Sequence, residues 1–499
     1  MFTRIMDYLD SKKEFRHHIT LMVGYVLVAL AIVMATVILL HQAYGFGLAK
    51  NGDVIQNGLT FFSSQPSPAN IYINGKKQPV STNTRLGLPA GIYDVKLTRD
   101  GYRDWRRSIN LEGGSVKHYD YPFLIPKKLV TRKVQTFPTA PGMMTQSPDR
   151  RWLLIHPSGE MTNIILYDLK NPDKPATELI LPSGVLTPAS VNESWQLSEW
   201  SSDNQHVLLQ HNYDGKSEFV VVDRLNPEES LNINNTLSVV PSKLTLRDKK
   251  HDKYYIHDQA SGSLLTASLA NPVPVEAIQK VIAYKSYGND TILYITAHQA
   301  PQARALVKML NLRNKKTITV RSLPAAETYV LDLTRYSDEM YVAAGATTDS
   351  RVYVFKDPVR QKVIQPEQAP APEQVLHVVN PNYLSFSTSA QFIMAQTGNR
   401  FGVYDSENEV GFNYSTLPAI DLPQTHASWM DGNRLVYASG GQLLMLDYDN
   451  QNTQTLMPIS PGFLPAFTPD YDQVYALAPG DLAGQVELTV TDLLTPSDQ

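Results

Sequence analysis

The chain has 499 residues, of which 42% are hydrophobic and 18% are charged, a balance that excludes wholesale disorder. Its formal net charge of -4 argues against a nucleic-acid partner, because such proteins usually carry an excess of Lys and Arg. The absence of cysteine excludes disulfides, thiol catalysis and Cys-ligated metal clusters. The 26 Tyr and 33 Pro residues favour strands and turns, so an all-β fold is expected.

Residues 19–41 are predicted to form a transmembrane anchor helix. The run Ile19–Leu40 contains 22 residues without a charge, and as a helix it would span about 33 Å, enough for a hydrocarbon core of about 30 Å. Two alternatives remain open: a cleaved signal peptide, which usually has a shorter apolar region, and a buried core helix.

The charges beside this segment predict its orientation. Four basic residues precede it, and Lys50 alone follows closely; the four are Arg4, Lys12, Lys13 and Arg16. The positive-inside rule then predicts a cytoplasmic tail at 1–18, with the bulk of the chain outside the cytoplasm. The tail either lies on the membrane surface as an amphipathic helix or is frayed. The chain is thus predicted to be a single-pass protein of the cell membrane.

Residues 58–125 show short alternating runs separated by turn signals. Apolar residues alternate around Ile71 and Tyr93, and Asn74-Gly75 is typical of a hairpin turn. Trp105 shares one face with the apolar residues that follow it, and Tyr119 to Phe123 predict a last strand. Five or six short strands in so few residues predict a small β-sandwich.

This stretch resembles the PEGA domain, a small bacterial surface module. The resemblance rests on three segments: Pro66-Ser67-Pro68-Ala69, Leu88-Pro89-Ala90-Gly91-x-Tyr93 and Gly101-Tyr102-x-x-Trp105. It implies a cell-envelope location and a binding or spacer role. Tyr102 and Trp105 are expected to pack in the core, with stacking on a sugar as the alternative.

Residues 129–499 contain a repeated unit, a turn that ends in Asp followed by an apolar strand. Its eight copies are spaced by 38 to 54 residues and centre on Asp149, Asp203, Asp252, Asp290, Asp338, Ser389, Asp431 and Asp470. A four-stranded blade needs about 40–50 residues and cannot bury its faces alone. The repeat therefore predicts an eight-bladed β-propeller, with seven blades as the alternative because the copy at Asp252 is weak.

The repeated Asp has a local structural explanation. Its carboxylate can accept backbone N–H groups in the tight turn between the first two strands of a blade. A repeated calcium-binding or catalytic carboxylate is the alternative. The Ser/Thr-Pro-Asp entry at Asp149 and Asp470 resembles the WD40-like family of the TolB type, which implies a propeller architecture.

Two segments have predicted places in the ring. Residues 129–137 (LVTRKVQTF) lack another partner, so they are predicted to be the outer strand of the last blade, beside Val486–Val490. Residues 365–374 (QPEQAPAPEQ) are too Pro-rich for an inner strand and are predicted to form a loop between the fifth and sixth blades.

The sequence contains no recognisable catalytic or metal-binding motif, so no catalytic, cofactor-binding or metal-ligating residue is predicted, and the binding residues are unknown. The start of a calcium-binding loop is imitated by Asp447, Asp449 and Gln451. Such a loop needs Gly at its sixth position and a bidentate Glu at its twelfth, where this chain has Asn452 and Pro458. A solvated turn is therefore favoured. The His17-His18 pair is interpreted as interfacial. No cofactor is expected.

These patterns predict a non-enzymatic, membrane-anchored binding or scaffold protein of the bacterial cell envelope. The sandwich would act as a stalk and the propeller as a recognition platform for an envelope protein or polysaccharide. The alternative is a hydrolase, lyase or oxidoreductase with its site in the central channel, since fold does not decide function. A third interpretation, an assembly or secretion scaffold, differs only in its partner.

Overall fold

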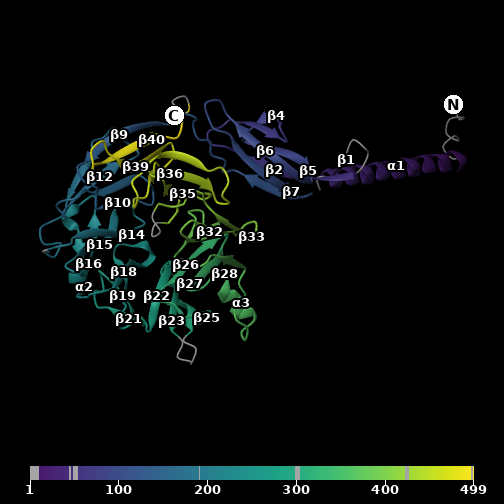
Figure 1. Ribbon diagram of the computed structural model, residues 1–499. Coiled ribbons are helices and arrows are strands. Elements are labelled where there is room, and N and C mark those ends of the chain that lie inside the picture. The colour runs from purple at the N-terminus through teal and green to yellow at the C-terminus, as the bar shows by residue number, and fades with distance from the viewer. Residues whose placement is uncertain are drawn as a thin grey trace, which may run out of the picture. The chain divides into compact units, whose positions relative to one another are not determined.

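The computed structural model describes residues 11–43, 46–48, 54–189, 191–297, 304–417, 419–421, 426–495 and 498. These residues divide into two units, Met1–Lys127 and Lys128–Gln499 (Figure 1). The first ten residues of the predicted cytoplasmic tail lie outside the described part. Apart from α1 and a few short helices, the regular secondary structure of the described residues is β-strand, which confirms the predicted all-β fold.

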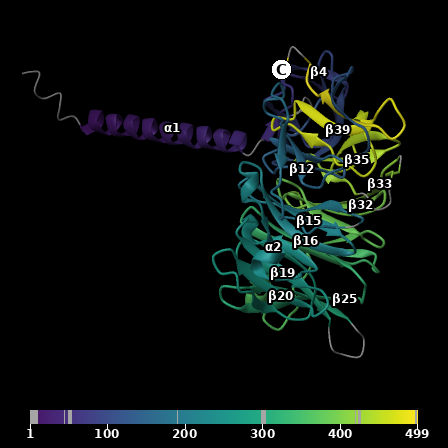
Figure 2. The ribbon, with the colours of Figure 1, turned by 90° about the vertical axis from the view of Figure 1, so that its left-hand side faces the viewer.

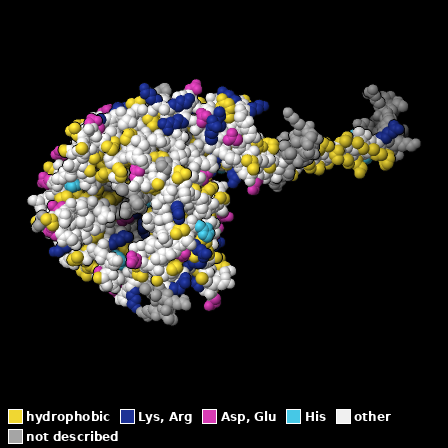
Figure 3. All heavy atoms as spheres, viewed as in Figure 1, with side chains coloured by type: hydrophobic (Ala, Val, Ile, Leu, Met, Phe, Trp, Pro, Cys, Tyr) yellow, Lys and Arg dark blue, Asp and Glu magenta, His cyan; other side chains and the backbone are white. Residues whose placement is uncertain are grey.

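Helix α1 (Ser11–Ala43) contains the predicted anchor. Within it, Phe15–Leu40 has a mean hydropathy of 2.8 and is long and apolar enough to cross a membrane. Its apolar side chains are exposed, as at Leu30 (58%), and they cover the visible side of the helix (Figure 3). A buried core helix would instead pack these side chains inside the protein, so that alternative is wrong.

The remainder of the first unit is a β-sandwich of two four-stranded sheets. One sheet contains β1 (Phe46–Leu48), β2 (Val54–Phe62), β5 (Thr84–Pro89) and β8 (Val116–Tyr119), which pairs with β2 in parallel. The other has the order β4 (Lys76–Ser81), β3 (Asn70–Ile73), β6 (Gly91–Thr98) and β7 (Trp105–Leu111).

The core of the sandwich lies between these sheets. Phe62 of β2 packs with Ile71 of β3 and Trp105 of β7, and all three are almost fully buried. Burial alternates strictly along β7, which confirms the predicted apolar face. Asn74 and Gly75 both have positive φ angles, 48° and 77°, as a tight turn between β3 and β4 requires.

Two sequence-based details of the sandwich are wrong. The predicted last strand through Tyr119, Tyr121 and Phe123 stops at Tyr119, and Phe123 forms an isolated bridge with Gln65. Pro122 has no N–H to donate to a sheet, which explains the early end. The described residues also contain more strands than the predicted five or six, because the chain makes an extra short strand at β4 and another at β5.

The second unit is a β-propeller, in which the described residues form eight four-stranded antiparallel sheets. Sheet 1 contains β10 (Met143–Gln146), β11 (Trp152–His156), β12 (Asn163–Asp168) and β13 (Thr177–Ile180). Sheet 2 contains β14 (Ser194–Trp200), β15 (His206–Tyr213), β16 (Lys216–Asp223) and β17 (Leu231–Asn232). Sheet 3 contains β18 (Lys243–Leu246), β19 (Lys253–Asp258), β20 (Ser263–Ser268) and β21 (Val275–Ile278). Sheet 4 contains β22 (Val281–Tyr287), β23 (Thr291–Ala297), β24 (Ala305–Asn311) and β25 (Lys316–Leu323).

The other four sheets continue the same order. Sheet 5 contains β26 (Tyr329–Tyr336), β27 (Glu339–Ala346), β28 (Arg351–Lys356) and β29 (Gln374–His377). Sheet 6 contains β30 (Tyr383–Phe386), β31 (Phe392–Thr397), β32 (Arg400–Asp405) and β33 (Val410–Ser415). Sheet 7 contains β34 (Ser428–Trp429), β35 (Arg434–Ser439), β36 (Gln442–Asp447) and β37 (Gln454–Pro458). Sheet 8 contains β38 (Ala466–Phe467), β39 (Gln473–Pro479), β40 (Val486–Asp492) and β9 (Val130–Phe137).

Short helices interrupt some connections between these strands. They are η2 (Pro227–Glu229), α2 (Ile233–Leu237), η3 (Arg247–Lys249) and α3 (Pro358–Ile364). Successive sheets follow one another around the unit (Figures 1 and 2), and the space-filling view shows a hollow at its centre (Figure 3).

The propeller core lies between neighbouring sheets. One cluster joins Leu154 of sheet 1 to Val207 of sheet 2, and another joins Leu153 of sheet 1 to Leu477 of sheet 8. Both faces of the second strands are therefore buried, whereas outer strands such as β13 are largely exposed. Each sheet depends on its neighbours for burial, as expected for a propeller.

The eighth sheet closes the ring with a strand from the beginning of the unit. β9 pairs antiparallel with β40, with Phe137 opposite Val486 and Val130 opposite Asp492. The prediction that residues 129–137 supply the outer strand of the last blade is confirmed. Early and late segments thereby share one sheet.

The predicted position of residues 365–374 is wrong. These residues follow α3, and Gln374 already pairs with Val354 of β28 as the first residue of β29. The segment is thus a connection within the fifth sheet and not between the fifth and sixth. The insertion of α3 between two strands of one sheet accounts for the error, since the sequence spacing gave no sign of it.

Candidate functional site

The repeated Asp turns all lie between the first and second strands of their sheets, as the repeat predicts. At Asp203, Oδ1 accepts the backbone N–H groups of Gln205 (2.8 Å) and His206 (3.0 Å). Asp431 accepts the corresponding two groups at 2.7 and 2.8 Å. The local structural explanation of the repeated Asp is confirmed at these turns.

A second repeated carboxylate, at the end of the third strand, is tied to the first turn. Asp223 accepts backbone N–H groups from Leu225 and Asn226, and Gln205 donates its side-chain amide to both oxygens at 3.0 and 2.9 Å. Equivalent pairs are Arg151–Asp168, Gln391–Asp405 and Gln473–Asp492. This cross-link between the two turns of a sheet was not foreseen from the sequence.

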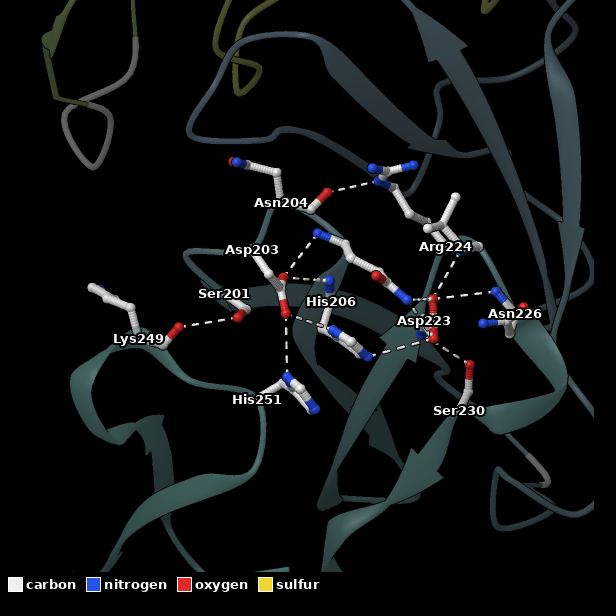
Figure 4. A network of polar contacts seen from close by, with 12 residues as sticks. Ser201, Asp203, Asn204, His206, Asp223, Arg224, Asn226, Ser230, Lys249 and His251 are labelled. Carbon is white, nitrogen blue, oxygen red and sulfur yellow. Dashed lines mark hydrogen bonds and ion pairs between the residues drawn. The ribbon is translucent and has the colours of Figure 1, made fainter.

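Two successive sheets bring three potential ligand side chains together at this end of their strands (Figure 4). Asp203 lies in the turn between β14 and β15, His206 is the first residue of β15, and His251 precedes β19 in the next sheet. Oδ2 of Asp203 lies 2.7 Å from Nδ1 of His206 and 3.2 Å from Nδ1 of His251. The two imidazole rings are stacked, with centroids 3.7 Å apart and planes inclined by 13°. We call these three residues the Asp-His-His cluster.

Neighbouring hydrogen bonds hold the cluster in place. The carbonyl oxygen of Lys249 accepts the Ser201 hydroxyl at 3.0 Å and the Ser202 backbone N–H at 2.8 Å, which joins the turns of sheets 2 and 3. On the other side of His206, Nε2 lies 3.4 Å from Oδ2 of the buried Asp223. Both turns are therefore fixed relative to each other.

Hydrogen bonds favour negative charge on Asp203 and on the neighbouring Asp223. Partial burial raises the pKa of Asp203, but hydrogen bonds from the backbone N–H groups of His206 and Gln205 and from the His206 ring outweigh burial and hold that pKa at about 2. The pKa of Asp223 is also lowered, because the hydrogen bonds from Gln205 and two backbone N–H groups outweigh its burial. Both groups are thus ionised at neutral pH, and the nearby Arg224 guanidinium offsets part of their charge.

Polar side chains on the inner strands form hydrogen bonds between neighbouring sheets. Asp332 of β26 accepts the backbone N–H of Leu333 at 3.0 Å and that of Phe386, in the next sheet, at 3.3 Å. The Trp429 indole likewise donates to Ser385, and Thr245 bonds Tyr284. The Trp429 and Thr245 bonds join neighbouring sheets, whereas Asp332 also interacts electrostatically with Lys285 of β22 and Lys249 of η3.

A small cavity lies between sheets 7 and 8. Its volume is ≈ 210 Å³, and His426, Tyr437 and Phe463 contribute to its lining. Small-molecule sites usually measure about 300–1,000 Å³, so this cavity is a poor candidate for a substrate site.

The residues singled out in the sequence do not assemble into a site. Tyr102 and Trp105 are 1% and 2% exposed, so they pack in the sandwich core and cannot stack on a sugar. Asp447 accepts the side-chain amide of Asn452, which supports a turn, but its carboxylate is buried and not solvated as expected. The His17-His18 pair lies on α1 with both side chains exposed.

Sequence reasoning treated Asp203 as a turn residue and missed its two histidines. A signal was available: His206 follows Asp203 by three residues, and His251 directly precedes Asp252, the equivalent residue of the next copy. Superposing successive copies of the repeat would have placed both imidazoles at neighbouring turns.

Comparison with known proteins finds one family model and several solved structures that resemble parts of the chain. Residues 59–124 match the family model of the PEGA domain, and a search of curated proteins finds no match. The structure described as oligogalacturonate lyase in complex with manganese is similar at 12% identity and a TM-score of 0.41, over 73% of this chain and 99% of that one. The Dos1 propeller is similar at 12% identity and 0.42, over 73% and 94%. The Cps50 (Swd1) propeller of Myceliophteria thermophila is similar at 12% identity and 0.38, over 73% and 100%. At these identities the likeness concerns the fold alone.

The chain therefore contains a PEGA domain and a β-propeller, together with an N-terminal helix of transmembrane length.

Proposed function

We propose that this protein is a membrane-anchored binding or scaffold protein of the cell envelope. In this proposal α1 is the anchor, the PEGA domain is a spacer and the propeller is the recognition platform. The observation that carries it is the presence in one chain of an exposed 26-residue apolar helix, a PEGA match and a propeller.

The charge distribution supports an orientation with the N-terminus in the cytoplasm. Lys12, Lys13 and Arg16 lie at the N-terminal end of α1, where the positive-inside rule favours the cytoplasmic side. The PEGA domain and the propeller would then lie outside the cytoplasm. An envelope protein or polysaccharide is the proposed partner, since the net charge of -4 does not favour nucleic acid.

Single-cysteine labelling tests the anchor and its orientation, because the natural chain contains no cysteine. We would compare Val240→Cys, at a side chain that is 86% exposed in the propeller, with Thr3→Cys near the N-terminus. In spheroplasts, a membrane-impermeant maleimide should label position 240 directly and position 3 after permeabilisation only. The reverse pattern, or release of a shortened chain from the membrane, would contradict the proposal.

Photo-crosslinking in membranes tests the recognition role. We would place a photoreactive amino acid at Lys250, in the turn between β18 and β19. A matched variant would carry it at Lys216, the first residue of β16, beside the β15–β16 turn at the other end of the strands. A specific adduct from one position would identify both the partner and the binding face. Absence of adducts at both positions, together with measurable turnover of an envelope polymer, would favour the channel-enzyme alternative.

A further inference from the structure

The Asp-His-His cluster is the one described group in which ligand-type side chains from two sheets meet within 4.8 Å of one another. Two of its donors are imidazole nitrogens and one is a carboxylate oxygen. Imidazole ligands suit zinc, copper, nickel and iron, whereas calcium and magnesium prefer an all-oxygen set. The residue types therefore favour a divalent transition metal over the calcium that a repeated Asp would suggest.

His206 lies between two carboxylates: its Nε2 is 3.4 Å from Oδ2 of Asp223, and its Nδ1 is 2.7 Å from Oδ2 of Asp203. His251 directs its Nδ1 at the same oxygen of Asp203, at 3.2 Å. Two imidazole nitrogens and one carboxylate oxygen, all of them metal-ligand atoms, therefore meet where two sheets adjoin.

We propose that Asp203, His206 and His251 bind one divalent transition-metal ion, with Zn²⁺ as the best match, and that the ion clamps sheets 2 and 3 together. Tetrahedral zinc ligands with bonds of about 2.0 Å lie roughly 3.3 Å apart. The two distances from Asp203 Oδ2, 2.7 and 3.2 Å, are already near that value. The two rings, which are stacked with planes inclined by 13°, must tilt apart so that both Nδ1 lone pairs point at the ion.

The surroundings also match those of known metal sites. Metal-bound histidines usually direct their other ring nitrogen at a carboxylate or carbonyl, and Nε2 of His206 lies 3.4 Å from the Asp223 carboxylate. The second oxygen of Asp203 is held by two backbone N–H groups, which orients Oδ2 toward the histidines. The side chains of Asp203 and His251 are 35% and 38% exposed, so an ion can reach the cluster and one position stays open.

The experiment is a zinc titration of the full chain, purified in detergent without a histidine tag. All variants would carry His17→Gln and His18→Gln, so that this exposed pair adds no background binding. Calorimetry with ZnCl₂ and the absorption spectrum with Co²⁺ would be recorded for the parent, Asp203→Asn, His251→Gln and the control His377→Gln, an exposed histidine of β29. Asp203→Asn keeps an oxygen for the turn N–H groups, so the local fold is retained.

We expect one zinc ion per chain in the parent and in the control, and a loss of affinity of at least about tenfold in both cluster variants. Asp223→Asn should weaken binding by about 10- to 100-fold by releasing the His206 ring. Zinc should also raise the melting temperature of the parent but not of His251→Gln. If His251→Gln without metal melts well below the parent, its loss of zinc binding could reflect misfolding. His206→Gln is then used as the cluster variant in its place.

The competing arrangement is a contact bridged by protons alone, with ring N–H groups donating to Asp203. It predicts no zinc binding by the parent, or equal binding by the parent and both cluster variants. Either result would overturn the proposal. Because the titration measures metal alone, its failure leaves the anchoring and recognition roles untouched.

Discussion

The guanidinium of Arg132 lies 3.1 Å from each carboxylate oxygen of Asp492, although the two residues are 360 positions apart in the chain. They sit on β9 and β40, the two strands that close the propeller. Arg132 is 53% exposed, so this ion pair adds little stability by itself. Most of β9 is exposed, so the closure instead depends on its backbone pairing with β40 and on the buried side chain of Phe137.

Replacement of Phe137 in β9 should destabilise the propeller. Phe137 is 3% exposed and packs with Leu153 and Leu488, so Phe137→Ala should lower the free energy of unfolding by about 3–5 kcal/mol. Urea unfolding followed by circular dichroism checks this value. Val130→Ala, at a residue that is 47% exposed on the same strand, is the control and should change it by less than about 1 kcal/mol.

Truncation of Trp105 should destabilise the PEGA domain, because this side chain packs in the core and does not form a sugar-binding site. The side chain is 2% exposed among Ile71, Leu97 and Ile109, so Trp105→Ala should cost about 3–5 kcal/mol of unfolding free energy. Ile92→Ala, at a side chain that is 73% exposed, should have little effect. A Trp105→Ala protein of unchanged stability would contradict the assigned core position.

The Arg151–Asp168 pair should make part of the stability depend on pH. The Arg151 hydrogen bond, aided by Asn171 and the Lys170 backbone, holds the pKa of Asp168 well below its ordinary value of 3.8. Folding lowers this pKa, so the stabilisation is complete above the unfolded pKa and is lost as the pH falls toward the folded one.

Asp168→Asn should therefore reduce the free energy of unfolding by about 1 kcal/mol at pH 7, a value that allows for the partial exposure of Arg151. The difference from the parent should shrink below pH about 4. Denaturant unfolding between pH 3 and 7 measures it, with the exposed Asp173→Asn as control. A difference that stays constant with pH would contradict the assigned ion pair.

A charge in the middle of α1 should weaken membrane anchoring. Leu30 lies near the centre of the apolar segment, where an arginine costs about 2.5–3.5 kcal/mol of insertion free energy. Leu30→Arg should increase the fraction of the chain that carbonate extracts from membranes. Ser11→Arg, at the first residue of α1, should leave that fraction unchanged.

The sequence was informative where structure is local. The turns of all eight copies, seven with Asp and one with Ser389, were found because their chemistry depends on a few neighbouring residues, as the N–H groups bonded by Asp203 and Asp431 show. Phe137 could be assigned to the closing sheet because its segment had no other partner. The burial of Trp105 followed from strict alternation along one strand.

The sequence was uninformative where structure depends on pairing between distant segments. Gln374 joins β28 across the inserted α3, and no local pattern distinguishes that partner from the next sheet. His251 meets Asp203 because sheet 3 stacks on sheet 2, so the cluster exists only in the folded ring. Side chains that are far apart in the chain come together through packing, which sequence spacing does not encode.

The strand order of the eighth sheet also constrains the time course of folding. During synthesis β9 is made before the other propeller strands, yet its partner β40 is made after all of them. Until β40 is made, the backbone N–H and C=O groups of β9 lack their partner strand. Unpaired strand edges of this kind can pair with other chains and start aggregation. The adjacent cations Arg132 and Lys133 on β9 provide charge of the kind that protects such edges. The ring can therefore be completed only after the last strand has been made. Until then, the two basic residues of β9 should disfavour pairing of this strand with other chains.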